Sequence, residues 1–283
     1  MSGDPVSSRR HAETSPVTGR RRRDRVPLRV RMIVAPVVLG AALLAGWFAT
    51  VGLSHVPAYF LPSPGAVGRS LVNGLVVRGD LWPYIGTTFV EALLGCAAGI
   101  AVGIPLAVVI VRSRWVSSAV LPFLGATQAI PAIALAPLLA LWIAYGLASV
   151  VVLCALMVFF PILVSTVVGL RHIDQEVKDA ALIDGAGSWA SLRFIEVPLA
   201  LPNILAGVRN GFTLSVTGAV VGEMVMGGRG VGTLLTAQRE RFDTAGMIAS
   251  ILVLAAIAAI IYSLVSLVER RWSLTVPKGE KRR

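Results

Sequence analysis

The chain has 283 residues, of which 55% are hydrophobic and only 14% are charged, and its mean hydropathy is +0.78. A soluble domain usually carries about 25% charged residues, so this composition excludes a disordered chain, a secreted disulfide scaffold and an ordinary cytosolic enzyme. The net charge of +11 comes from the two ends, because residues 1–31 hold nine Arg against three acids and residues 269–283 hold six Lys and Arg against two acids. A nearly neutral, apolar body between basic ends is typical of a polytopic membrane protein.

Residues 1–31 are predicted to form a disordered, basic cytoplasmic tail that sets topology and attracts anionic membrane lipids. The first apolar run follows at residues 32–53. A cleaved signal peptide is an alternative reading of this run. The apolar region of a signal peptide is usually only about 7–15 residues long, so a retained membrane anchor is favoured.

Five more apolar runs follow, and a helix needs about 20 apolar residues to cross a bilayer core of about 30 Å. They cover residues 84–111, 116–142, 147–170, 206–226 and 247–268. The fold class predicted is therefore all-α, a polytopic membrane protein with six transmembrane helices. Its transmembrane domain covers residues 32–268, and residues 269–283 form a second basic cytoplasmic tail.

The Lys and Arg residues predict the orientation, because they are retained on the cytoplasmic side of a membrane. With both termini inside, the cytoplasmic segments hold twenty-one Lys and Arg, and the two long outer segments hold five. This predicts an N-in, C-in, multi-pass protein of the cell membrane. Orientation accounts for the basic charge, so nucleic acid is not an expected partner.

Two carboxylates lie within apolar runs, where ionisable groups are costly. Glu91 precedes Gly95, Gly99 and Gly103, whose spacing of four places the glycines on one helix face that a second helix can approach closely. The role of Glu91 itself stays open. We interpret Glu223 as a structural group, with Arg229 as its partner, in preference to a substrate ligand.

The usual signatures of a catalyst are absent from the sequence. It contains no G-x-x-x-x-G-K-[ST] loop, no catalytic triad and no cluster with metal-ligand spacing. We therefore expect no enzymatic activity, no cofactor and no metal. Cys96 and Cys154 lie in apolar runs and are interpreted as small hydrophobic residues.

The longest polar stretch of the body, residues 171–205, is cytoplasmic in this topology. Asp174 is expected to cap a short helix that contains Ala180 and Ala181, and Gly185 is expected to end that helix in a left-handed conformation. A helix of this length is not stable alone, so we expect it to dock on a partner.

A second helix is expected directly after the first. Ser188 is its predicted N-cap, and Pro198 and Pro202 are expected to break it before the fifth apolar run.

This stretch resembles the EAA loop of ABC importer permeases, E-A-A-x3-G-x9-I-x-L-P. Asp179 replaces the Glu and Val197 replaces the Leu, and the spacing is kept. In that family the loop forms a coupling helix that sits in a groove of the ATPase subunit. The resemblance implies a type I ABC importer permease-like fold and an ATPase-coupling set of Asp179, Ala180, Ala181, Gly185, Ile195 and Pro198.

Motifs elsewhere in residues 55–272 resemble the nitrate/sulfonate/taurine-type permeases. They include Leu61-Pro62-Ser63-Pro64, Ile130-Pro131 and Gly222-Glu223-Met224. The resemblance implies an ATP-driven importer subunit that translocates a small solute, either a sulfonate-, nitrate- or taurine-like anion or a small heterocycle. An extracytoplasmic solute-binding protein would deliver the solute, and a separate ABC ATPase subunit would hydrolyse ATP.

Six helices are few for a complete translocation path, so we expect a homodimer with the path on its two-fold axis. The polar candidates for lining that path are Thr127, Gln128, Ser215 and Glu223. One alternative is a secondary transporter or channel that does not depend on an ATPase, which would need internal repeats and more ionisable groups in the membrane. An intramembrane enzyme is a further alternative, and the missing catalytic residues argue against it.

Overall fold

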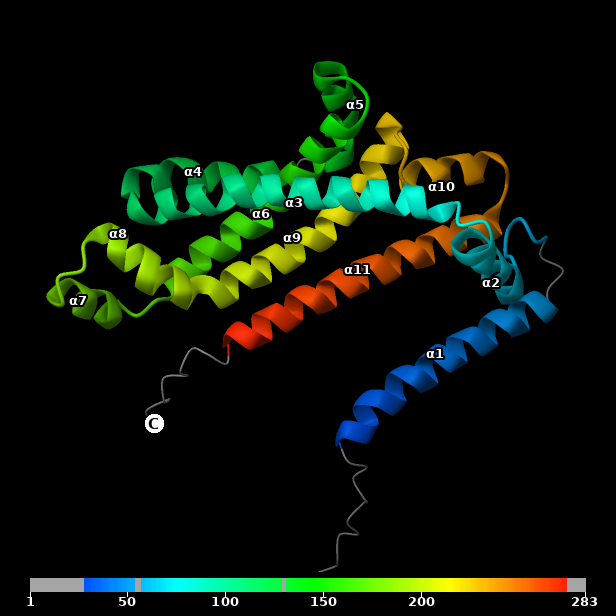
Figure 1. Cartoon of the computed structure of the whole chain (residues 1–283), viewed down its shortest axis with the longest axis horizontal. Coiled ribbons are helices and arrows are strands. Elements are labelled where there is room, and N and C mark those ends of the chain that lie inside the picture. Colours follow the sequence, from blue (N-terminus) through cyan, green and yellow to red (C-terminus); the bar gives the residue numbers. More distant parts are fainter. Residues whose placement is uncertain (1–27, 54–56, 129–130, 274–283) are drawn as a thin grey trace, which may run out of the picture. The chain divides into compact units, whose positions relative to one another are not determined.

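The computed structural model describes residues 28–53, 57–128 and 131–273, with the backbone alone at residues 28–33, 121, 124–128, 132 and 268–273. The described residues form helices and no β-strand, which confirms the predicted all-α fold (Figure 1). The helices are α1 (Leu28–Leu53), α2 (Pro64–Val72), η1 (Asn73–Val77), α3 (Leu81–Arg112), α4 (Arg114–Gln128), α5 (Ala132–Ile143), α6 (Leu147–Arg171), α7 (Gln175–Ile183), α8 (Ser188–Ser191), η2 (Leu192–Glu196), α9 (Val197–Met226), α10 (Val231–Glu240) and α11 (Thr244–Ser273).

The chain divides into two compact units, residues 1–50 and residues 51–283. The first unit contains most of α1, and the second contains all the later helices. The predicted tails lie mainly outside the described residues, at 1–27 and 274–283. Both α1 and α11 extend a few residues beyond the predicted spans into these tails.

Five of the described helical segments are long and apolar enough to cross a membrane: α1, α3, α6, the continuous helix Ser188–Met226, and α11. The third predicted span, residues 116–142, is divided into α4 and α5, and neither reaches the length of a single crossing. Pro131 explains the division, because it is the N-cap of α5 and its backbone is extended. A count of six single membrane-spanning helices is therefore not confirmed.

The centre of the second unit is α6, which packs against α3 on one side and α9 on the other. On α3, Gly95 lies against Cys154 and Gly103 lies against Phe159 of α6. A Cβ atom at Gly95 would overlap that of Cys154, so the helices approach closely only because glycine stands there. The predicted packing face of α3 is confirmed.

The other side of α6 meets a second set of glycines, on α9. Gly207 lies against Ser165, and Gly222 lies against Val150. The order of these contacts makes α9 antiparallel to α6, whereas α3 and α6 run parallel. Because parallel neighbours begin at the same end, the chain must return between them, and α4 and α5 make that return.

Both cysteines are buried and unpaired within this core. Cys96 lies on α3 and Cys154 on α6, and both belong to the same cluster of buried apolar side chains. They pack as the small hydrophobic residues that the sequence predicted.

Candidate coupling site on the loop between α6 and α9

The helix α7 has both of the ends predicted for it. The Asp174 side chain accepts a hydrogen bond of 3.1 Å from the backbone N–H of Glu176, which caps the first turn. Gly185 follows the helix with φ of +80°, and the N–H of Ala186 donates to the carbonyl of Ala181 at 2.9 Å. This closure by a left-handed glycine satisfies carbonyls of the last turn.

The second helix differs from its prediction at both ends. It begins at Ser188, but the N-cap is Gly187 and no side chain caps it, so Ser188 is not the N-cap. Pro198 and Pro202 do not break it, because α8, η2 and α9 form one continuous helix to Met226. At Pro198 the reason is the π-helical turn η2, in which the N–H of the preceding residue bonds five residues back, to Leu192. Pro202 lies inside α9 itself. A wider turn leaves room for a proline ring that an α-helical turn would exclude.

The structure places the predicted coupling residues at different depths. Asp179, Ala180, Gly185 and Pro198 are exposed, Ile195 is half-buried and Ala181 is buried. Every residue of α7 except Lys178 and Ala181 is exposed, and the exposed Asp179 and Ala180 are followed by the large apolar side chains of Leu182 and Ile183. Sequence reasoning missed these last two residues, although large apolar side chains within a polar loop were a signal of a contact surface.

An apolar hollow of about 450 Å³ lies on the second helix. Its lining residues are Trp189, Leu192, Arg193, Phe194, Val197, Pro198 and Leu201. Trp189 and Phe194 are 72% and 71% exposed, and sequence reasoning missed both. Together with the exposed end of α7, the hollow gives the loop a partly apolar surface that a second protein could cover.

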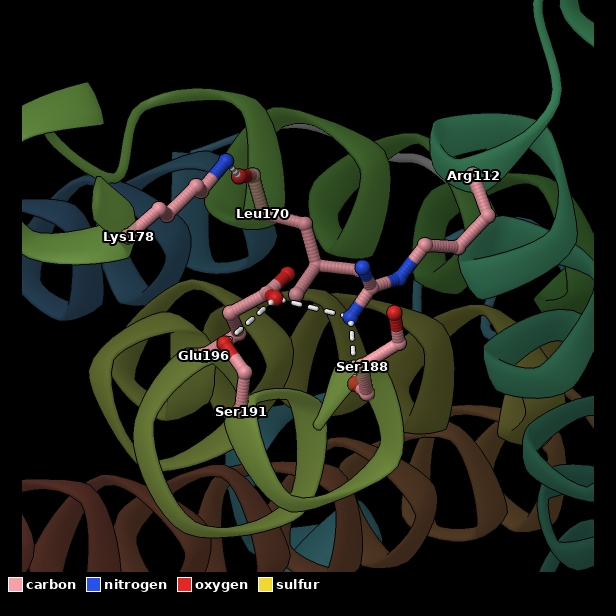
Figure 2. A network of polar contacts seen from close by, with 6 residues as sticks. All are labelled: Arg112, Leu170, Lys178, Ser188, Ser191 and Glu196. Atoms are coloured by element: carbon pink, nitrogen blue, oxygen red, sulfur yellow. Dashed lines mark hydrogen bonds and ion pairs between the residues drawn. The ribbon is translucent and has the colours of Figure 1, made fainter. Parts of the chain in front are cut away.

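A polar network fixes the loop to the end of α3 (Figure 2). Arg112, the last residue of α3, donates through Nη2 to Glu196 Oε1 at 2.7 Å and to the carbonyl of Ser188 at 3.1 Å. The same Glu196 oxygen accepts a bond of 3.2 Å from Ser191 Oγ. Glu196 is almost fully buried. The guanidinium of Arg112 balances the charge of its carboxylate.

Two further hydrogen bonds connect residues of the loop with α6 and α4. Lys178 Nζ on α7 donates to the carbonyl of Leu170 on α6 at 3.4 Å, as Figure 2 also shows. Arg171 Nη2, at the end of α6, donates to Ser117 Oγ on α4 at 2.7 Å. The loop is thus held on the ends of the long helices, and α7 lies outermost.

A family model confirms what this loop resembles. The model of the binding-protein-dependent transport system inner membrane component matches residues 99–274, which include the whole loop. The chain belongs to this family. It is a multi-pass inner-membrane permease component of an ABC importer.

Two curated relatives cover most of this permease. The riboflavin transport system permease protein RibX of Chloroflexus aurantiacus is 42% identical over 240 residues, which are 84% of this chain and 89% of the relative. The taurine transport system permease protein TauC of Escherichia coli is 28% identical over 88% of this chain and 92% of its own length. Among solved structures, an inward-facing MetNI methionine ABC transporter matches with a TM-score of 0.61 at 17% identity, over 68% of this chain and 95% of its own.

At the other end of the permease, a second polar cluster holds α10. Thr88 Oγ1 donates to Glu223 Oε1 at 2.7 Å and accepts a bond of 2.8 Å from the N–H of Val231, at the start of α10. The N–H of Gly232 donates to the other oxygen of Glu223. Glu223 is structural, as predicted, but the predicted partner Arg229 is wrong, because no ion pair joins the two residues. The donors to Glu223 are instead the Thr88 hydroxyl and the N–H of Gly232.

The path candidates lie in different environments. Ser215 is fully buried and donates from Oγ to the carbonyl of Ala92 on α3 at 2.6 Å. Glu223 is buried within the cluster just described. Thr127 and Gln128 form the last turn of α4, and their side chains lie outside the described part of the structure.

Glu91 is a further buried carboxyl group on α3. Its Oε2 atom has no hydrogen-bond partner within the described part of the chain. In the same part, no group of three or more His, Cys, Asp or Glu side chains is placed to hold a metal ion.

Proposed function

We propose that this permease is the translocating subunit of an ATP-driven importer and that its loop over residues 171–205 docks on an ABC ATPase subunit. The observation that supports this most directly is the loop itself. Its helix α7 is capped at both ends and exposes Asp179 and Ala180, while Ala181 is buried. When ATP binding moves the ATPase subunits, a docked helix moves with them and shifts the permease between its conformations.

The docking is tested by Ala180→Arg, which adds a long side chain at the exposed small surface of α7 and keeps good helix propensity. The ATPase subunit is expected to co-purify with the parent permease and to be lost from the variant, with a fall of about tenfold or more in ATP hydrolysis per permease. The control is Glu240→Arg, an exposed residue at the end of α10. Retention of the ATPase by Ala180→Arg at the parent level would refute the docking site.

Two more partners are part of the proposal. The family description supports an extracytoplasmic binding protein that delivers the solute. A homodimer would supply the second half of the path. Thr127 and Gln128 remain polar candidates for lining it, whereas Ser215 and Glu223 are buried within one permease chain. Native mass spectrometry of the purified complex is expected to show two permease chains, and a complex with a single permease chain would exclude the homodimer.

We infer that the solute is a small heterocycle and not a sulfonate-like anion. The support is the difference in identity between the two relatives, 42% for the riboflavin permease and 28% for the taurine permease. Uptake of labelled riboflavin and of labelled taurine is to be compared between cells with and without the permease gene. Loss of riboflavin uptake alone is expected on deletion, and loss of taurine uptake alone would reverse the assignment.

A further inference from the structure

Three polar links join α3 to the continuous helix Ser188–Met226. Each link is a hydrogen bond or ion pair between a side chain of one helix and a group of the other. The links are Arg112 with Glu196, the Ala92 carbonyl with Ser215, and Thr88 with Glu223. They occur in opposite order along the two antiparallel helices, so together they fix the register of one helix on the other.

The links lie far apart along the helix. At about 1.5 Å per residue, the 27 residues from Glu196 to Glu223 cover about 40 Å. Glu196, Ser215, Thr88 and Glu223 are all buried. A sliding or hinging motion between the two helices would leave several buried polar groups without partners, which is costly. The two helices therefore move together.

The outer link continues into α10. The N–H of Val231 donates to Thr88, and the N–H of Gly232 donates to Glu223, so the first turn of α10 is bonded to both helices. A Cβ atom at Gly230 would overlap the Glu223 carboxylate, so the close approach requires glycine. Any displacement of the two joined helices is thus imposed on the start of α10.

We propose that α3 and the helix Ser188–Met226 form one rigid lever, which carries a displacement of the coupling loop to α10 at the far end. Arg112 is the positioning residue that fastens the loop end of this lever. The proposal rests on the proposed function, because it needs an ATPase that moves the loop. It goes further by naming the element that responds, α10, and the bonds through which it responds.

The loop end of the lever depends on Arg112 in particular. Of the two ion pairs within the described residues, only Arg112–Glu196 joins the loop to α3, since the other pair, Arg78–Asp80, is exposed and lies before α3. The bonds of Lys178 and Arg171 lead to α6 and α4 instead. Arg112 is itself partly exposed, so a polar side chain is tolerated at its position.

The test places a reporter on α10 in the complete complex of permease and ATPase. Arg239→Cys introduces a thiol at an exposed position of α10, and the native Cys96 and Cys154 are buried and react slowly. The rate of labelling by a maleimide is measured with and without ATP. In the Arg239→Cys parent, ATP is expected to change this rate by about fivefold.

Two variants then break the lever at its two ends. Arg112→Gln removes the loop link, and Thr88→Val removes the outer link with little change in volume. Each is expected to keep ATP hydrolysis and to lose most of the ATP-dependent change at residue 239. Arg112→Lys keeps the positive charge and is expected to keep part of the ATP-dependent change. This partial rescue would not be seen if Arg112 acted only in folding.

The matched control is Arg114→Gln, an exposed arginine two residues away on α4. It is expected to keep the full response. A full response in both Arg112→Gln and Thr88→Val would overturn the lever while leaving the proposed function in place. A parent complex that contains the ATPase but in which ATP has no effect on residue 239 would also overturn the lever alone. A parent that contains no ATPase would overturn the proposed function and the lever with it.

Discussion

Ala144 has a backbone conformation that residues with a side chain rarely adopt. It follows α5 with φ of 87° and ψ of 165°, in a region used almost entirely by glycine. Its N–H still bonds to the carbonyl of Ala140, and its own carbonyl accepts from Ser149 Oγ, so its position is fixed by contacts on both sides. The strain at this residue is therefore held in place by its neighbours.

We predict that Ala144→Gly stabilises the permease by about 1 kcal/mol, since the relief of strain exceeds the greater freedom of glycine in the unfolded chain. Thermal unfolding in detergent should show a higher midpoint. As a control, Ala101→Gly on the exposed face of α3 is expected to lower the midpoint, because glycine weakens a helix interior. A lower midpoint for Ala144→Gly would contradict the strain argument.

The role of a single residue could be predicted where its partner lies close to it in the sequence. The cap by Asp174 and the left-handed Gly185 follow from neighbours within a few positions, and the structure confirms both. Glu223 was assigned to Arg229, the nearest cation in the sequence, but its side-chain partner is Thr88, 135 residues away. Arg112 and Glu196 are 84 residues apart, and no local pattern links them.

Between elements, the closest packing occurs where glycines of α3 and α9 meet α6. We predict that Gly95→Ala destabilises the permease by about 1–3 kcal/mol, because the added methyl overlaps Cys154 and the α6 backbone lies close behind it. The measurement is the unfolding midpoint in detergent.

The same helix offers a matched control. Gly86 on α3 has nothing within 4 Å of the position of an added Cβ. Gly86→Ala is expected to leave the midpoint unchanged or to raise it slightly. Removing the opposing side chain in the double variant Gly95→Ala/Cys154→Gly should restore part of the loss, and equal effects at residues 86 and 95 would refute close packing as the cause.

The helices themselves were predicted well where apolar runs were uninterrupted, and less well where prolines stood. The runs at residues 84–111 and 147–170 agree with α3 and α6 to within a few residues. Pro198 was expected to end a helix, but the π-helical turn before it keeps the helix continuous. Pro131 does separate two helices. A proline in a sequence therefore marks a change of backbone geometry and does not by itself say whether the helix ends.

At the level of the whole molecule, the parallel arrangement of α3 and α6 bears on topology. If α4 and α5 together return the chain across the membrane, the number of crossings is even and both termini lie on one side. This agrees with the excess of Lys and Arg in the predicted cytoplasmic segments. The N-in, C-in prediction therefore requires that α4 and α5 together cross the membrane.

We predict that alkaline phosphatase fused after residue 283 is inactive in cells, because it stays in the cytoplasm. The same enzyme fused after Glu240, in the predicted outer segment, is expected to be active. The measurement is phosphatase activity normalised to the amount of fusion protein. An active fusion at residue 283 would contradict the N-in, C-in prediction.

The two partners of each polar link between α3 and the helix Ser188–Met226 are synthesised at different times. Synthesis adds about 5–20 residues per second, so Glu223 leaves the ribosome roughly 7–27 s after Thr88. For most of that interval the whole of α3 has been synthesised, whereas the end of α9 that carries Glu223 has not. Until its partner helices are made, lipid surrounds the face of α3 that they later cover. A nascent chain that stalls before residue 223 is therefore expected to be a preferred substrate of membrane proteases.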